Sequence, residues 1–363
     1  MGGGWGDRPG VSGVSTPELS ERLPSLGQAG GSQSGRGVTR AAAALKTRSA
    51  ESGAGRFTEF VLPPLTFAEY LRFIEREAEL IEAVPADTGA PRFRTTNVFA
   101  LNEEFVNYLN YGGYPEAVFT AGVRADPRRF IKSDIIDKVL LRDLPSLYGI
   151  ADVQELNRLF NTLAYNTAGE LSLEDLSKTS HVAKNTLVRY LDYLEAAFLI
   201  RRLRRVDEDA AHFRRMTTFK VFLTNPTMRA ALFGPVTDQD AAMGSLTETA
   251  IFSQWLHNAS FVDTLYYARW ARGEVDLVSL DTARQRPQFA IEVKWSDRAG
   301  ENPKEIRGLI EFARRHPLPR LPLLTTISTA GVRYFGDVAV ELEPASLHSY
   351  TVAKNTLEPN NNQ

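Results

Sequence analysis

Three charged residues near the C-terminus have types and spacing that could do chemistry together. In the segment QFAIEVKWS, apolar and polar residues alternate, so Glu292 and Lys294 are expected side by side on one face of a strand. The preceding segment, RGEVDLVSL, is joined to it by a short polar loop, and the two can pair as a hairpin. That pairing would bring Asp276 to the same end of the sheet as Glu292.

A fourth charged residue, Glu248, is expected to join this group from a helix at residues 244–258. Three apolar residues follow Glu248 at helical spacing, so its carboxylate would share the core-facing stripe. A carboxylate that points inward is costly unless it is paired, protonated or bound to a metal. Glu248, Asp276 and Glu292 are therefore the predicted metal ligands, and together with Lys294 they form one predicted catalytic pocket.

The chemistry that suits this arrangement is metal-assisted hydrolysis of a phosphodiester bond. Two or three carboxylates hold Mg²⁺ and leave several of its waters in place. The metal polarises the phosphate and lowers the pKa of a bound water, while a nearby lysine helps to deprotonate that water and stabilises charge on the phosphate. Mg²⁺ is therefore the expected cofactor, and DNA the expected substrate.

A second interpretation of these residues involves no catalysis. Charged residues often alternate with apolar ones on half-exposed strands, so an Asp followed later by Glu-x-Lys also arises by chance. Folds of the nuclease type, moreover, often serve without cutting. The same four residues would then belong to a scaffold.

Residues 151–225 show a second pattern, which is typical of a winged helix-turn-helix. Helices are expected at 153–165, 172–178 and 183–198, followed by strands in FLIRRLRRV and MTTFKVFLTN. The predicted nucleic-acid contacts are polar and basic residues of the third helix and the next strand, namely Lys184, Asn185, Arg189, Arg201, Arg202, Arg204 and Arg205. A solvated charged face, or a winged helix that binds protein, would account for the same residues.

The composition limits the remaining chemistry. The 363 residues include no cysteine, which excludes disulfides, thiol catalysis and cysteine-type zinc sites. The five histidines lack zinc-binding spacing, so a metal would be a hard cation held by carboxylates. The net charge of −2 restricts nucleic-acid binding to local patches. No apolar run approaches the roughly 18–20 residues of a membrane span, so no membrane contact is expected and the cytoplasm is the expected compartment.

The rest of the chain is predicted from periodicity and turn signals. Residues 1–37, rich in Gly and Ser, are expected to be disordered, and residues 346–363 to form a flexible tail. A Thr-x-x-Glu capping box predicts a helix over 67–81. Further helices are expected at 98–111, 127–149 and 303–315. The order helix, three strands, helix, strand over 244–345 predicts a mixed α/β sandwich, in an α+β multidomain chain.

Eight segments, in the same order, carry a resemblance to a known family. They are GRFTEFVLPPLTFAEYL, LNYGGYPEAVF, VLLRDLPSLYG, NTLVRYLDYLEAAFLIRRL, FKVFLTNPTMRAALFG, GSLTETAIFSQWL, GEVDLV and AIEVKWS, and they cover about residues 38–345. The chain resembles a large bacterial and archaeal family of AAA-type ATP-binding proteins with a C-terminal domain of unknown function 4143. The resemblance implies a winged helix followed by a PD-(D/E)XK restriction-endonuclease-like domain at 244–345.

The start of the chain departs from that family. Its members carry a full ATPase core, whereas residues 38–56 resemble only the last helix of that core. No phosphate-binding loop occurs, so neither ATP binding nor ATP hydrolysis is expected. Residues 38–150 are interpreted as the ATPase remnant and a helical region. The hypothesis is a truncated or mis-started product, or a divergent member that lost the motor.

Three functions remain open from the sequence. The first is a metal-dependent DNA nuclease that uses the four charged residues. The second is a non-catalytic DNA-binding module, in which the winged helix reads the nucleic acid. The third is a protein-interaction accessory module that works with an ATPase supplied in trans.

Overall fold

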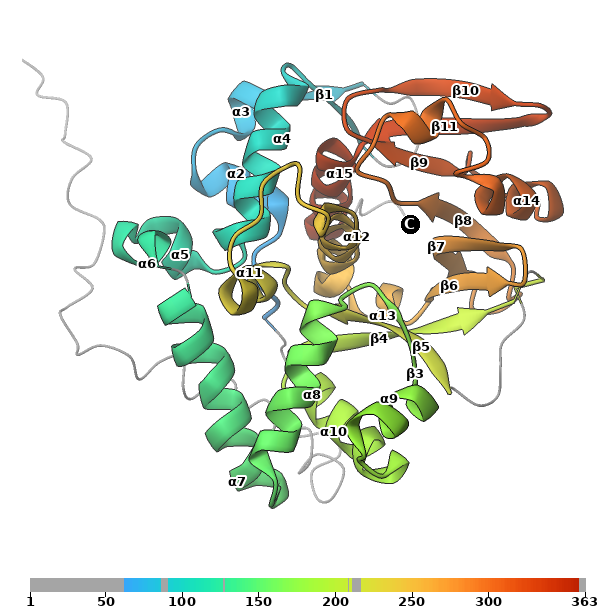
Figure 1. Cartoon of the computed structure of the whole chain (residues 1–363). Helices are drawn as coiled ribbons and strands as arrows, with labels where there is room; N and C mark the ends of the chain where they lie inside the picture. Colours follow the sequence, from blue (N-terminus) through green and yellow to red (C-terminus); the bar gives the residue numbers. More distant parts are fainter. Residues whose placement is uncertain (1–61, 86–90, 127, 208, 211–216, 359–363) are drawn as a thin grey trace, which may run out of the picture. The chain divides into compact units, whose positions relative to one another are not determined.

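The computed structural model describes residues 62–85, 91–126, 128–207, 209–210 and 217–358, which belong to one compact unit over residues 39–363. The protein is mixed α/β, with a large mixed sheet and many helices (Figure 1). The described strands of this sheet are β3 (Glu170–Ser172), β4 (Ile200–Val206), β5 (Thr218–Leu223), β6 (Leu265–Trp270), β7 (Gly273–Leu280), β8 (Pro287–Glu292), β9 (Leu323–Thr326), β10 (Gly331–Phe335) and β11 (Val338–Pro344).

The strand order in this sheet is β10-β11-β9-β8-β7-β6-β4-β5-β3. Strands β6, β7 and β8 form an antiparallel meander, and β9 returns parallel to β8 after helix α14 (Arg307–Arg315). The predicted order of helix, three strands, helix and strand is therefore confirmed for the C-terminal part. The edge hairpin of β10 and β11 was not predicted.

The sheet continues across a boundary that the sequence suggested between two domains. Strand β4 pairs antiparallel with β5 and parallel with β6. The strands predicted at the end of the 151–225 region therefore belong to the same sheet as those of the 244–345 region. This continuity decides how the site is built, because side chains from both regions can reach one pocket.

Helix α12 (Met243–Gln254) lies between this sheet and a group of helices. Its residues from Leu246 to Gln254 are all buried. Ile251 and Phe252 pack with residues of the sheet, whereas Leu246 and Ala250 pack in a core with helices of the N-terminal and C-terminal parts. The helix is therefore buried on several sides, whereas the sequence predicted burial along a single stripe.

The N-terminal helices are shorter than predicted. The capping box of Thr66 and Glu69 is confirmed, but the helix predicted over 67–81 divides into α2 (Phe67–Phe73) and α3 (Glu77–Leu80). Glu75 lies between them with φ of 59°, a left-handed conformation that a continuous right-handed helix does not contain. A two-stranded sheet follows, in which β1 (Ile81–Val84) pairs with β2 (Arg92–Thr95).

The helices predicted at 98–111 and 127–149 form at those positions, but both include π-helical segments. The helix predicted at 98–111 is α4 (Val98–Asn107) continued by a π-helical segment, η1 (Tyr108–Gly112). The helix predicted at 127–149 consists of the π-helical segments η2 (Arg128–Ile136) and η3 (Val139–Asp143) and of α7 (Leu144–Tyr148). Short unpredicted helices are α5 (Pro115–Phe119), α6 (Ala121–Ala125), α11 (Thr227–Phe233) and α13 (Ala259–Val262).

The helices of the predicted helix-turn-helix form where expected. They are α8 (Val153–Tyr165), α9 (Leu173–Ser180) and α10 (Lys184–Ala196), and the side chain of Ser172 caps α9. The short strand β3 between α8 and α9 was not predicted. Within the described residues, no helix has both the length and the apolar character that crossing a membrane requires.

The prediction of a flexible tail from residue 346 is wrong for most of that segment. Residues Ala345–Leu357 form helix α15, with Tyr350 and Ala353 buried against the N-terminal helices. The Tyr350 hydroxyl donates to Glu77 Oε1 at 2.7 Å, and Lys354 Nζ lies 3.2 Å from the same oxygen. Residues 359–363, like residues 1–37, lie outside the described part of the chain.

Glu77→Gln should loosen the contact between α15 and the N-terminal helices. Burial alone would raise the pKa of Glu77, but hydrogen bonds from Arg72, Tyr350 and Lys354 outweigh burial and lower it. A carboxylate with a lowered pKa stabilises the fold above about pH 4.5, and this stability is lost as pH falls through the folded-state pKa. We expect a loss of about 1–3 kcal/mol in the free energy of unfolding at pH 7.

The measurement is urea unfolding at pH 7 and again near pH 3.5, with the surface variant Glu103→Gln as control. The loss caused by Glu77→Gln should shrink at the lower pH, and the control should match the wild type at both. A loss that grows on acidification would contradict the assigned role of Glu77.

Candidate functional site

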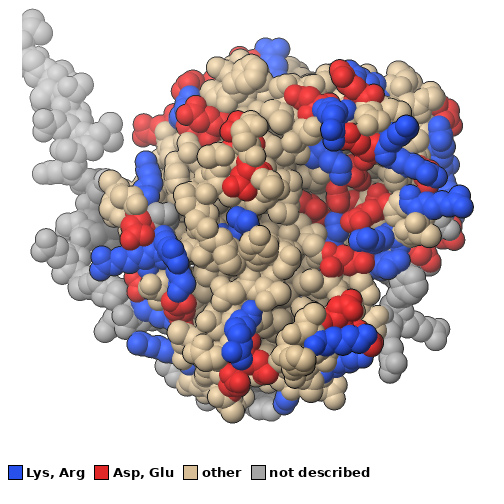
Figure 2. Space-filling model, in the orientation of Figure 1, with Lys and Arg blue, Asp and Glu red and all other residues tan. Residues whose placement is uncertain are grey.

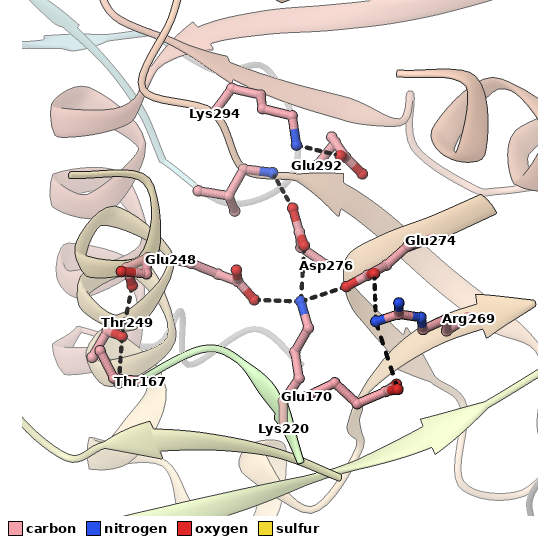
Figure 3. Close-up of polar contacts among 12 residues, drawn as sticks. Thr167, Glu170, Lys220, Glu248, Thr249, Arg269, Glu274, Asp276, Glu292 and Lys294 are labelled. Carbon is pink, nitrogen blue, oxygen red and sulfur yellow. Dashed lines mark hydrogen bonds and ion pairs between the residues drawn. The ribbon is translucent and has the colours of Figure 1, made fainter. Parts of the chain in front are cut away.

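A buried lysine, which the sequence did not single out, lies at the centre of the acidic pocket (Figure 3). The Nζ atom of Lys220, on β5, is 2.9 Å from Oε1 of Glu248, Oε1 of Glu274 and Oδ1 of Asp276. The Lys220 side chain is only 3% exposed. An ammonium has three protons, so each carboxylate can accept one of them.

The predicted hairpin is confirmed and brings the predicted residues together. Leu277 of β7 pairs with Ile291 of β8, so Asp276 and Glu292 lie at the same end of the ladder. Lys294 Nζ is 2.6 Å from Glu292 Oε1. The four residues predicted from the sequence therefore meet in one region. Asp276 lies between Glu248, with which it shares Lys220, and the pair of Glu292 and Lys294.

Lys294 reaches Glu292 in a different way from the one predicted. Strand β8 ends at Glu292, so the expectation that both residues lie on one strand is wrong. The next amide, that of Val293, donates to Asp276 Oδ2 at 2.9 Å, and the amide of Lys294 donates to Oγ1 of Thr325 on β9 at 2.8 Å. The chain leaves the strand ladder because these amides donate to side chains. The hydrogen bond from the Val293 amide also holds the carboxylate of Asp276 in place.

Lys220 can reach Asp276 only because the sheet curls. Strands β4 and β6 separate β5 from β7, so a flat sheet would place β5 and β7 roughly 14 Å apart. That distance is longer than a lysine side chain. A second set of ion pairs also joins distant strands of the curled sheet. The guanidinium of Arg269, on β6, lies 3.6 Å from the carboxylate of Glu170 on β3 and 3.2 Å from that of Glu274 on β7.

Helix α14 supports the acidic strand from its other side. A Cβ atom at Gly308 would lie 2.1 Å from the carbonyl oxygen of Glu274 and 2.7 Å from its amide nitrogen. Only glycine allows this approach of helix to strand. The backbone that carries Glu274 and Asp276 is therefore held directly against α14.

Burial and the charges of neighbouring side chains shift the pKa values of the pocket's residues in different directions. Burial and the neighbouring Asp276 raise the pKa of both Glu248 and Glu292 to about 8. Burial would raise the pKa of Asp276 as well, but Lys220 and Lys294 outweigh it and lower that pKa. Burial opposes the charge on Lys220, yet the three carboxylates raise its pKa well above 10.5. The pocket thus combines Asp276, whose charged form is favoured, with two glutamates whose charged forms are disfavoured by burial.

The pocket opens into a cleft of about 770 Å³. Its lining includes Glu248, Asp276, Lys294 and Trp295, together with Asp238 and Asp240 from the loop before α12. In Figure 2, acidic atoms gather right of centre, where Figure 1 places β7 and β8, and Lys and Arg atoms lie above and to the right of them. A small ion or a phosphate group from solvent would therefore reach Glu248 and Asp276 through this cleft.

The side chains fit a divalent cation at two carboxylates better than at three. Among the described residues, no group of three or more His, Asp and Glu is arranged to hold a metal ion. The predicted ligand Glu248 accepts a hydrogen bond from the ammonium of Lys220, at 2.9 Å. In contrast, Glu292 Oε2 is buried without a hydrogen-bond partner, in a side chain that is 9% exposed. Mg²⁺ commonly binds through one or two carboxylates and keeps several waters, so Asp276 and Glu292 suit it.

Sequence reasoning missed Lys220, Glu274, Arg269 and Glu170. A signal for Lys220 exists, because a lysine in the middle of the apolar strand segment FKVFL must either break the strand or find buried acids. Glu274 is two residues before Asp276 and therefore shares its face of the strand. Nothing local to Arg269 or Glu170 indicates that β6 and β3 approach each other.

The predicted nucleic-acid residues do not share one environment. Lys184 pairs with Glu174 at 3.0 Å, and Arg202 pairs with Asp192 at 2.6 Å and with Glu195. Arg205 donates to the carbonyl of Arg269 at 2.9 Å, and the guanidinium of Arg201 lies 5.8 Å from the ring of Phe198. Of the predicted residues, those that stay exposed are Lys184, Asn185, Arg189 and Arg204.

Comparison with known proteins shows similarity to proteins without a described function. A family model described as a domain of unknown function, DUF8612, matches residues 102–239. An uncharacterized protein of Haemophilus influenzae is 22% identical over 266 residues, which cover 71% of this chain and 58% of the relative. The uncharacterized protein MJ1637 of Methanocaldococcus jannaschii is 26% identical over 226 residues, which cover 59% of this chain and 46% of the relative. No solved structure matches the chain.

This chain therefore spans about half the length of the curated relatives that it matches. The family match contains Lys220 but ends before Glu248. The pocket is accordingly built by one lysine from inside the matched region and by acids from outside it.

Lys220→Met should destabilise the fold, because it removes one buried cation and leaves three carboxylates without it. Breaking a buried ion pair in this way typically costs about 3–5 kcal/mol. Adding Glu248→Gln should recover part of that loss, since the double variant buries one acid fewer. Urea unfolding of the single and double variants measures the coupling, for which we expect about 1–3 kcal/mol. A Lys220→Met protein as stable as the wild type would refute the role of this network.

Proposed function

We propose that this chain carries a PD-(D/E)XK nuclease-like domain that binds Mg²⁺ at Asp276 and Glu292 and hydrolyses phosphodiester bonds in DNA. The observation that carries this proposal is the buried, unpartnered Oε2 of Glu292, at the same end of the hairpin as Asp276. A buried carboxylate oxygen without a partner is costly, and a bound cation would offset that cost.

The arrangement of elements supports the same proposal. The α12-β6-β7-β8-α14-β9 order places Glu248 on the opening helix, Asp276 on the second strand and a Glu-x-Lys sequence that starts at the end of the third. This is the distribution that the resemblance to nuclease-like domains implies. We also propose that α8 to β5 form a winged helix, because its helices and strands occur in the expected order.

The residues of the pocket have distinct roles in this proposal. The bound metal would polarise the phosphate and supply an activated water. Asp276 is held in place by the Val293 amide and by Lys220, so its carboxylate is oriented before any ligand arrives. Lys294 lies next to Glu292 and borders the cleft, where its ammonium can donate hydrogen bonds to a phosphate oxygen.

A second candidate function is a DNA-binding or protein-interaction module that does not cut. The observation that favours it is Lys220, whose ammonium already serves three of the pocket's carboxylates. In this case the pocket stabilises the fold, and the exposed residues of α10 and β4 make the contacts. An accessory role beside an ATPase supplied in trans belongs to the same class and would require a protein partner.

Metal binding separates the two candidates. Mn²⁺ or Mg²⁺ should raise the melting temperature of the wild type, because a ligand that binds only the folded state stabilises it. Glu292→Gln and Asp276→Asn should abolish this rise, whereas Glu103→Gln on the surface of α4 should retain it. The same metals should support nicking of supercoiled plasmid by the wild type only. Nicking that persists in both site variants would exclude this pocket as the catalytic centre.

DNA binding by the winged-helix region would have its own signature. Arg189→Ala and Arg204→Ala should each reduce the slope of log affinity against log salt by about one, because each would remove one phosphate contact. Arg202→Ala, whose guanidinium is bonded to Asp192 and Glu195, should leave the slope unchanged if it still folds. An affinity for DNA that is insensitive to salt would contradict this interface.

A further inference from the structure

We infer that the ammonium of Lys220 takes the place of a second metal ion, so that the pocket binds one divalent cation and not a pair. This inference rests on the proposed function, because it concerns the same acidic residues. It assigns Lys220 as a positioning residue that acts through the carboxylates around it.

The contacts of Lys220 are those of a bound cation. Its Nζ atom has three carboxylate oxygens at 2.9 Å, and they come from α12 and from two positions on β7. The ring of Tyr267 adds an aromatic face 5.5 Å from Nζ. Three acceptors saturate the three protons of the ammonium, so this side of the pocket is complete without a metal.

The two oxygens of Asp276 separate the pocket into two sides. Oδ1 accepts from Lys220, and Oδ2 accepts from the amide of Val293, next to Glu292. On the Lys220 side, Glu248 and Glu274 are both engaged. On the Glu292 side, the partner of Oε1 is Lys294, and Oε2 has none. The pocket's buried carboxylate oxygen that an added cation would satisfy is therefore on the Glu292 side.

Lys220 is also too well buried to leave its position easily. It lies on a paired strand, opposite Leu203 of β4 and Glu170 of β3, so the backbone cannot move it without breaking the sheet. A metal that entered among Glu248, Glu274 and Asp276 would meet a positive charge less than 3 Å from each oxygen. Repulsion at that distance excludes a second divalent ion while Lys220 is present.

The experiment is the stoichiometry of Mn²⁺ binding to the full chain, measured by calorimetry. We expect one ion per chain for the wild type and for Lys220→Arg, which keeps a cation. Lys220→Ala should bind two, because Glu248, Glu274 and Asp276 become available, and Lys220→Ala with Glu274→Gln should return to one. Near-ultraviolet circular dichroism checks that each variant is folded.

The outcomes distinguish this inference from the proposed function. Two ions in the wild type would overturn the inference, and this arm needs no variant to fold. One ion in both the wild type and a folded Lys220→Ala would overturn it too, while the proposed function stands. No ion in the wild type but one in Lys220→Ala would support the role of Lys220 and refute the proposed Mg²⁺ site. No ion in either protein would refute both.

Discussion

The ion pairs between Lys220 and the carboxylates of Glu248, Glu274 and Asp276 are the constraint on which the rest of the site depends. A buried ammonium is unfavourable by itself, and so is each buried carboxylate, so none of these groups is stable inside the protein without the others. Their mutual attraction holds β5 across from β7 and places α12 over both. The same ion pairs therefore account for both the curl of the sheet and the charged residues gathered in the pocket.

This arrangement also explains why residues 151–225 and 244–345 share one continuous sheet. The strands of residues 151–225 supply Lys220 and Glu170, whereas residues 244–345 supply Arg269 and the acids that pair with Lys220. If the two regions separated, the acids and the lysine would each lose their partners. The proposed DNA-reading helix and the proposed hydrolytic pocket are thus joined through a shared core, which gives a physical basis for testing them together in one intact chain.

The sequence predicted the local elements well where periodicity was regular, as in α8, α10 and the β7–β8 hairpin, and it brought Asp276, Glu292 and Lys294 together correctly. It failed at α15, whose buried residues face several partners and leave no clear polar side. It also failed at Lys220, because that contact depends on a sheet curling across two intervening strands. Glu248 was placed correctly in the pocket, but its pairing with the ammonium of Lys220 could not be predicted, because that contact depends on tertiary structure.

The central claim is that Lys220 remains a charged ammonium bound to three carboxylates, and NMR of lysine ¹⁵Nζ tests it most directly. The Lys220 signal, assigned from its loss in Lys220→Arg, should keep the chemical shift of a charged ammonium at pH 10.5, where an ordinary lysine is about half neutral. This result follows because the carboxylates raise the pKa of Lys220 well above 10.5. A Lys220 signal that titrates at or below the pH of the surface lysines would contradict the account.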